Sequence, residues 1–294
     1  MARKYQIATA TLLTIILSFF NIAFAGVWTG SSHVKAASVD YQGDTTRKSL
    51  TDYGINLQTR YLDRLDMMLG YSQLKLNASQ GSNVRQNQFV LGGNWFQYTD
   101  LISGRVGWHV KGYSLTSPSS TIANVYTGGW SYLNYRKTLY LDTLFTQSQY
   151  SNSQSSENTV NQLNLSFEFS PGFRSSWLSL QIFVIDNTDD VLFDNTLYSA
   201  NIEWTQFLSR TGFPIPMKLI VGAQLGDQRY LVLHRLDSIN NNPDIQTLSY
   251  WANASWQIND HAELGLSIAA SEYETDQQAN YDGVYTSLLL TLKW

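Results

Sequence analysis

The sequence predicts an all-β chain that closes into a transmembrane antiparallel up-and-down β-barrel of about 14 strands, with about 12 to 16 possible. Three observations predict this fold. Apolar and polar residues alternate along many segments of strand length, mostly short turns alternate with longer polar segments, and aromatic residues gather near the segment ends. Strands with one face in lipid and the other in water produce the first pattern. Short turns on one side of a membrane and longer loops on the other side produce the second pattern. Aromatic side chains at the two membrane interfaces produce the third.

The C-terminal segment, Tyr281 to Trp294, shows the alternation most clearly. Its apolar face comprises Val284, Thr286, Leu288, Leu290, Leu292 and Trp294, and its mixed face comprises Tyr285, Ser287, Leu289, Thr291 and Lys293. This segment resembles the closing strand of Gram-negative outer-membrane β-barrels, whose last residue is typically aromatic and is read by the barrel-assembly machinery. The resemblance implies that Tyr285, Leu290, Leu292 and Trp294 form an assembly signal. It also implies that the assembly machinery and outer-membrane lipid are partners.

The N-terminal half of the mature chain contains seven predicted strands: His33–Gln42, Tyr53–Leu62, Met67–Leu76, Gln88–Tyr98, Ile102–Tyr113, Ile122–Tyr135 and Leu139–Tyr150. The first alternates weakly, but without it the strand count is odd, which single-chain bacterial barrels avoid. The second sets Tyr53 and Ile55 against Gly54 and Asn56. The alternation of the third slips near Ser72, which indicates a bulge.

Six further strands precede the closing one: Leu163–Ser170, Trp177–Asp186, Leu197–Phe207, Met217–Gln228, Gln246–Ile258 and Ala262–Tyr273. Their alternation is more regular; Leu163–Ser170, for example, sets Leu165 and Phe167 against Asn164 and Ser166. The turns near 63–66, 99–101, 136–138, 171–174, 208–216 and 259–261 are mostly short. The connections at 43–51, 77–85, 114–121, 151–158, 187–196, 229–245 and 274–280 are longer and polar. This sorting predicts periplasmic turns and extracellular loops.

The N-terminus predicts export. Arg3 and Lys4 precede an apolar run that ends in Ala23-Phe24-Ala25, an A-x-A cleavage signature. We therefore expect residues 1–25 to be a cleaved signal peptide and 26–294 to form a single barrel domain; the alternative is an uncleaved anchor. Removing Arg3 and Lys4 leaves 17 basic residues against 23 acidic ones, a net charge of −6, which argues against nucleic acid as a partner. There is no cysteine to form a disulfide or a thiolate metal site.

The predicted inner face carries charges of both signs. Arg60, Arg105, Lys218 and Lys293, together with Glu168, Glu203 and Glu263, lie near the predicted periplasmic strand ends. Asp142 lies slightly deeper, and His109 and Lys111 lie further along their strand. These groups could form a constriction that tunes selectivity, or they could be salt bridges that brace the lumen. Four basic and four acidic groups at one level nearly cancel, which predicts weak ion selectivity.

Most other predicted inner residues are small or polar, which suits a water-filled lumen. Several large side chains are exceptions: Phe96, Trp130, Tyr132, Trp177, Phe183 and Trp251. They could narrow the channel or offer stacking faces to a sugar. Alternatively, those near strand ends point outward as part of the aromatic girdle, and their assignment to the inner face is wrong. The longest loop, 229–245, carries His234, Arg229, Asp237 and Asp244; we expect solvated charge there, with a cation or surface partner as the alternative.

The predicted function follows from these features. We expect an outer-membrane, porin-like channel for passive, weakly selective diffusion of small polar solutes. The main alternative is a structural or surface-interaction barrel with a closed lumen, adhesin-like or active in envelope assembly; a transporter of hydrophobic compounds is a weaker third. We expect no catalytic residue, metal site or cofactor, because the four histidines lack a nucleophile elbow or zinc-ligand spacing around them. Oligomeric state and gating are not predicted.

Overall fold

The computed structural model describes residues 28–44, 47–78, 83–117, 121–151, 157–171, 175–187, 196–208, 215–233, 238–239, 244–275 and 280–294. Every secondary-structure element there is a strand. The N-terminal ones are β1 Trp28–Gln42, β2 Arg47–Tyr61, β3 Leu65–Ala78, β4 Val84–Thr99, β5 Gly104–Thr116, β6 Thr121–Asn134, β7 Leu139–Ser151 and β8 Glu157–Phe169. The others are β9 Ser176–Asn187, β10 Thr196–Phe207, β11 Lys218–Gln228, β12 Val232–Leu233, β13 Ser238–Ile239, β14 Ile245–Asn259, β15 Ala262–Glu274 and β16 Asn280–Lys293. Across these ranges, no helix has the length and apolar character needed to cross a membrane.

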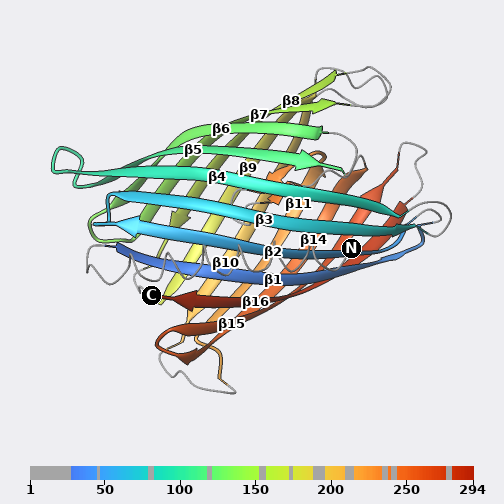
Figure 1. The fold of residues 1–294 in the computed structure, drawn as a ribbon. Coiled ribbons are helices and arrows are strands. Elements are labelled where there is room, and N and C mark those ends of the chain that lie inside the picture. The colour runs from blue at the N-terminus through green and yellow to red at the C-terminus, as the bar shows by residue number, and fades with distance from the viewer. Residues whose placement is uncertain are drawn as a thin grey trace, which may run out of the picture.

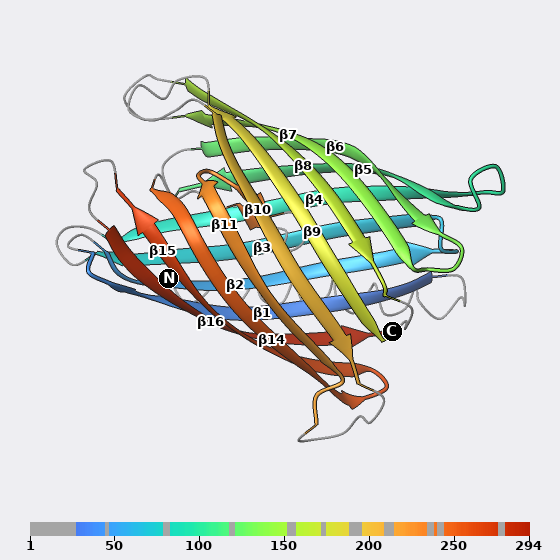
Figure 2. The ribbon, with the colours of Figure 1, turned by 180° about the vertical axis from the view of Figure 1, so that it is seen from behind.

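All strands except β12 and β13 form one closed antiparallel barrel of 14 strands (Figures 1 and 2), as the sequence predicted. Each strand pairs with its neighbour in the chain, and β11 pairs with β14 across the inserted β12–β13 hairpin. The barrel closes where β1 pairs with β16, from Ser31 opposite Lys293 to Gln42 opposite Asp282. An antiparallel pairing of first and last strands requires an even strand number, so the weakly alternating first segment is an integral strand.

The strands extend further than the hydrophobic pattern indicates. β2 begins at Arg47 instead of Tyr53, and β8 begins at Glu157 instead of Leu163. The barrel strands have 11 to 16 residues, whereas a tilted strand needs about 9–11 to cross the hydrocarbon layer. Polar residues beyond the apolar band still pair, because the ladder of backbone hydrogen bonds does not depend on side-chain polarity. The predicted bulge near Ser72 is absent, since β3 keeps one register with β4 from Leu65 to Leu76.

The two rims of the barrel differ. We call the rim with Trp28 and Trp294 the C-terminal rim; it also carries connections 62–64, 100–103, 135–138, 170–175, 208–217 and 260–261. We call the other the long-loop rim; it carries connections 43–46, 79–83, 117–120, 152–156, 188–195, 229–244 and 275–279. The rims are less sharply sorted by length than predicted, because the strands extend into the polar segments. The 229–244 connection remains the longest.

Side-chain exposure separates the two faces of the wall. In β16, Leu288, Leu290 and Leu292 are exposed on the outer face, as their alternation predicted, while Thr291 is buried on the inner face. Large apolar side chains are exposed in the same alternating way on the other barrel strands. A continuous apolar outer surface of this kind matches a hydrocarbon environment.

The barrel seam ends in a close contact at the C-terminal rim. The backbone N–H of Gly30 donates to the carbonyl of Trp294, and the N–H of Trp294 donates to the carbonyl of Gly30, both at 3.0 Å. A Cβ at position 30 would lie 2.7 Å from the Trp294 indole. Glycine is therefore required beneath this ring, and the last residue of the chain completes the ladder with the first strand.

Candidate functional site in the barrel lumen

The connection after β11 turns into the lumen. The register between β11 and β14 shifts between Leu225 and Gln228, where Gly226 adopts a φ of +87°. Tyr230 then adopts a left-handed φ of 51°, which costs a non-glycine residue free energy and needs support from its surroundings. That support includes Tyr150, whose ring centroid lies 4.9 Å from that of Tyr230. The chain is thereby directed inward and away from solvent.

The residues that follow complete a buried apolar cluster inside the barrel. Leu231 and Val232 are 1% and 0% exposed. They pack with inward side chains of eight consecutive strands, β3 to β10: Met68, Val90, Tyr113, Leu115, Ala123, Val125, Tyr150, Val160, Phe183, Ile185 and Leu197. We call these thirteen residues the lumen cluster. The prediction of a small and polar lumen is wrong for this part of the barrel, because the inward loop supplies apolar partners for the wall.

A glutamine on the wall holds the inward loop by its backbone. The Gln162 amide nitrogen donates to the Val232 carbonyl at 3.0 Å, and its amide oxygen accepts from the Val232 N–H at 2.9 Å. The same nitrogen donates to Asn164 Oδ1 at 2.7 Å. Gln162 is 1% exposed. The side chain thus pairs with the loop as a neighbouring strand would, and it satisfies backbone groups that burial would otherwise leave unpaired.

The far end of the same loop is fixed at the barrel seam. Asp244 is buried and forms an ion pair with Arg47 at the start of β2. It also accepts a hydrogen bond from the Tyr281 hydroxyl at 2.7 Å. The Tyr281 ring stacks on Tyr273 at 4.9 Å with an interplanar angle of 11°, and Tyr41 meets both rings edge-on. Both ends of the 229–244 connection therefore contact the inside of the barrel.

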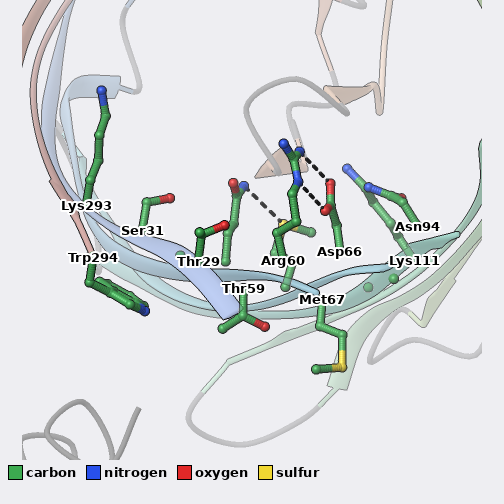
Figure 3. Close-up of a pocket in the computed structure, with 15 residues that line it drawn as sticks. Thr29, Ser31, Thr59, Arg60, Asp66, Met67, Asn94, Lys111, Lys293 and Trp294 are labelled. Atoms are coloured by element: carbon green, nitrogen blue, oxygen red, sulfur yellow. Dashed lines mark hydrogen bonds and ion pairs between the residues drawn. The ribbon is translucent and has the colours of Figure 1, made fainter. Parts of the chain in front are cut away.

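The half of the lumen next to the C-terminal rim, which we call the C-terminal half of the lumen, is polar and charged. On the wall formed by β1 to β5 and β16 lies a cavity of about 510 Å³ (Figure 3). Arg60 forms two bonds to Asp66, at 2.7 and 2.9 Å. Asp66, Asn94, Lys111 and Lys293 lie on the same side of the wall as Arg60, while Trp294 lies on the opposite side (Figure 3). The cations of this wall are thus presented to the lumen.

Other predicted charges on the inner face have defined neighbours. The Arg105 guanidinium lies 4.1 Å from the Phe96 ring centroid. His109 lies between Asn94 and Ser131, with 2.8 Å to each, and its Nε2 is 3.8 Å from an Asp142 carboxylate oxygen. Lys293 pairs with Glu263 at 3.2 Å.

A second cavity, of about 410 Å³, lies on the opposite wall. Its lining includes Glu168, Trp177, Glu203 and Lys218. Ser179 donates to Glu168 at 3.4 Å. The Trp251 indole N–H donates to Glu203 at 3.1 Å.

The side chain of Trp251 reaches Glu203 across Gly222. A Cβ at position 222 would lie 2.4 Å from the indole, so the glycine makes room for this reach.

The structure places Phe96, Trp177 and Trp251 on the inner face and Trp130 on the outer face. Trp130 pairs directly with Trp108, and directly paired residues share a face. The two are 41% and 58% exposed. The prediction that Trp130 lines the lumen is therefore wrong, and so is the same prediction for Tyr132, which alternates with inner-facing Ser131 and Leu133. Trp95, opposite Trp108, completes an outer row of tryptophans that is typical of an aromatic girdle.

The expectation of solvated charge in the longest loop is also wrong where the structure describes that loop. Arg229 and Asp244 are each 8% exposed. His234 and Asp237 lie outside the described residues. Sequence reasoning missed the inward turn, although one signal was present: the run Tyr230-Leu231-Val232-Leu233 is continuously apolar, which an exposed loop does not require. It also missed Gln162 and Arg47, whose roles depend on partners far away in the sequence.

Comparisons with known proteins give the fold a context. No protein-family model matches the chain, and no curated protein matches it. The chain is similar to a solved structure named the CymD monoaromatic hydrocarbon channel, at 6% identity and a TM-score of 0.56, over 91% of this chain and 88% of that one. It is similar to a bacterial polysaccharide outer membrane secretin, at 13% identity and a TM-score of 0.52, over 90% and 98%. Omp33 of Acinetobacter baumannii matches at 9% identity and a TM-score of 0.46, over 90% and 99%. The first two similarities, together with the closed barrel, show that the chain has the fold of outer-membrane β-barrels.

Proposed function

We propose that this protein is an outer-membrane, porin-like channel that lets small polar solutes diffuse passively, with weak charge selectivity, and that the inward loop limits the passage. The observation that carries the proposal is the charged and polar C-terminal half of the lumen, inside a closed barrel whose outer surface is apolar. We call this half of the lumen the vestibule. Water and small solutes enter it without losing their hydration. The proposal includes export through a signal peptide at residues 1–25 and insertion by the barrel-assembly machinery through the C-terminal strand, and it assigns no catalysis.

Weak selectivity is supported by the mixture of charges at the C-terminal rim. Arg60 is matched by Asp66, and Lys293 is matched by Glu263. Lys111 lies on one wall of the lumen, and Glu168, Glu203 and Lys218 lie together on the opposite wall. Rings of one charge sign produce strong ion filters, and this arrangement is mixed.

The names of two similar structures, a hydrocarbon channel and a polysaccharide secretin, support passage through the lumen as the general role. The lumen cluster favours a second candidate. Thirteen packed apolar residues at the long-loop half are what a closed, structural or surface-interaction barrel would contain. The two candidates differ in one measurable property, which is whether ions cross the folded protein.

The test is single-channel conductance of refolded residues 26–294 in a planar bilayer under a salt gradient. A heat-dependent shift in gel mobility confirms in parallel that the barrel is folded. We expect small, steady conductance steps and a reversal potential close to zero. A folded barrel that passes no current, both as wild type and after release of the loop by Gln162→Glu, would support the closed barrel instead.

A further inference from the structure

We propose that the β4–β5 and β6–β7 turns at the C-terminal rim bind the headgroup of an anionic phospholipid. The inference goes beyond the proposed function, because it concerns the outer edge of the barrel and holds whether or not ions cross the lumen. It depends on an exposed aliphatic turn tip, on two cations beside that tip, and on their position next to the outer row of tryptophans.

The β4–β5 turn presents an aliphatic tip. Leu101 is 93% exposed and Ile102 is 48% exposed. Hydrogen bonds hold the turn against its neighbour: the Tyr132 hydroxyl donates to the Ile102 carbonyl at 2.9 Å, and the Tyr135 hydroxyl donates to Asp100 at 2.9 Å. The hairpin of β4 and β5 extends past the neighbouring turns of this rim (Figures 1 and 2). Leu101 is therefore held out from the barrel in a fixed place.

The turn tip lies at the depth of the lipid headgroups. Tyr132 is on the outer face of β6, two residues from Trp130 in the outer row of tryptophans. Two residues of a strand tilted by about 45° advance about 5 Å along the membrane normal. The interfacial layer outside the hydrocarbon core is about 5–8 Å thick on each side, and an aromatic girdle marks its inner edge. The Ile102 carbonyl, which Tyr132 binds, therefore lies among headgroups, and the exposed side chain of Leu101 contacts lipid there.

Two cations stand next to this tip. Arg136 and Lys137 belong to the β6–β7 turn, and both are exposed. The Tyr135 N–H donates to the Ser103 carbonyl at 2.9 Å, which holds the β6–β7 and β4–β5 turns side by side. Among the residues that the structure describes, neither cation forms an ion pair. Asp100 is the one acid of these two turns, so the pair of turns has a net positive charge. Lysine and arginine at the membrane surface attract anionic lipid.

The occupant that fits this surface is a phospholipid, because charge and apolar area follow one another in the same order on both. The cations lie at the rim, and Tyr132 connects the turn tip to the outer row of Trp95, Trp108 and Trp130. A headgroup phosphate can contact Arg136 and Lys137 while its acyl chains lie against the tryptophans. A soluble phosphate compound would gain the charge contacts alone.

The test is native mass spectrometry of refolded residues 26–294 in detergent, with equal amounts of phosphatidylglycerol and phosphatidylcholine and with glycerol 3-phosphate as a soluble competitor. We expect the protein to retain more phosphatidylglycerol than phosphatidylcholine, without displacement by the competitor. The double variant Arg136→Gln/Lys137→Gln should lower phosphatidylglycerol retention about 25-fold, which is about fivefold per cation. Leu101→Asn should lower retention of both lipids, because an apolar contact does not distinguish headgroup charge.

The matched control is Lys48→Gln/Arg85→Gln, which removes two exposed cations near the long-loop rim. Its lipid retention should equal that of the wild type, and the gel-mobility shift shows that each variant is folded. Equal losses in the two double variants would overturn the inference. So would equal or no retention of the two phospholipids by the wild type, or displacement of phosphatidylglycerol by glycerol 3-phosphate. Because the turns lie outside the lumen, a barrel that passes no current refutes the proposed channel and leaves this site in place.

Discussion

Replacing Gln162 by glutamate tests whether the inward loop controls the passage. The Gln162 amide both donates to and accepts from the Val232 backbone, and it also donates to Asn164. An ionised carboxylate of nearly the same shape keeps the acceptor and loses both donors. It also faces the carbonyl of Val232 with a negative charge. We expect Gln162→Glu to release the loop from the wall at neutral pH and to raise single-channel conductance.

The size of the effect on loop docking follows from two buried acceptors that lose their hydrogen-bond donor. Leaving a buried acceptor without its donor costs about 1–3 kcal/mol, so the Val232 carbonyl and Asn164 Oδ1 together cost roughly 2–6 kcal/mol. With tenfold per 1.4 kcal/mol, the ratio of docked to released loop falls roughly 30-fold to 10⁴-fold. Burial of the carboxylate adds to this cost. Even the lower value is enough to change how often the loop leaves the lumen.

The effect should reverse with acid. A protonated carboxyl can again donate to the Val232 carbonyl, so protonation and docking favour one another. Docking of the Gln162→Glu loop is therefore present at low pH and lost as the pH rises. Conductance recorded between pH 4 and pH 8 checks this, with Gln162→Met as the uncharged control, whose open level should not depend on pH in the same way. Identical conductance of wild type and Gln162→Glu at neutral pH would refute the assigned role of the loop.

Three further predictions concern other contacts. Arg47→Ala removes the ion pair between Arg47 and buried Asp244 and should reduce the free energy of unfolding by about 1–3 kcal/mol, seen as a lower temperature for the gel-mobility shift. Gly30→Val forces the Trp294 ring away and should slow folding into lipid vesicles, whereas unchanged folding kinetics would contradict the seam contact. Leu231→Asp places a charge in the lumen cluster, so it should raise conductance without changing the strand content measured by circular dichroism.

The number of strands and most of their facing could be predicted because alternation is a local property. In β16, one face is apolar from Leu288 to Leu292 while the other is mixed, and the structure follows that pattern. In β6, the sequence around Trp130 reads Thr127-Gly-Gly-Trp-Ser131, with apolar residues on both faces and two glycines between them. Hydrophobicity alone cannot choose a face there. The choice is made by pairing with Trp108, a contact between strands that local alternation does not reveal.

The inward loop could not be placed for a related reason. The apolar run at Tyr230–Leu233 indicates that this stretch needs burial, but it does not indicate where. Its partners, Gln162 and Tyr150, lie 70 and 80 residues earlier in the chain, and Gln162 looks like an ordinary polar lumen residue in the sequence. Similarly, the charges of the vestibule could be named from their strand positions, whereas the pairing of Glu203 with Trp251 depends on Gly222 between them.

The hydrogen bonds between Gly30 and Trp294 have a consequence for the order of events during biogenesis. A closed sheet has no free edge, but this sheet closes only when β16 pairs with β1. Until then β1 carries a row of unpaired backbone groups, which is a template for aggregation. We therefore expect the edge of β1 to need protection before the barrel closes, and loss of Trp294 would remove the two hydrogen bonds that extend the β1–β16 ladder to Gly30.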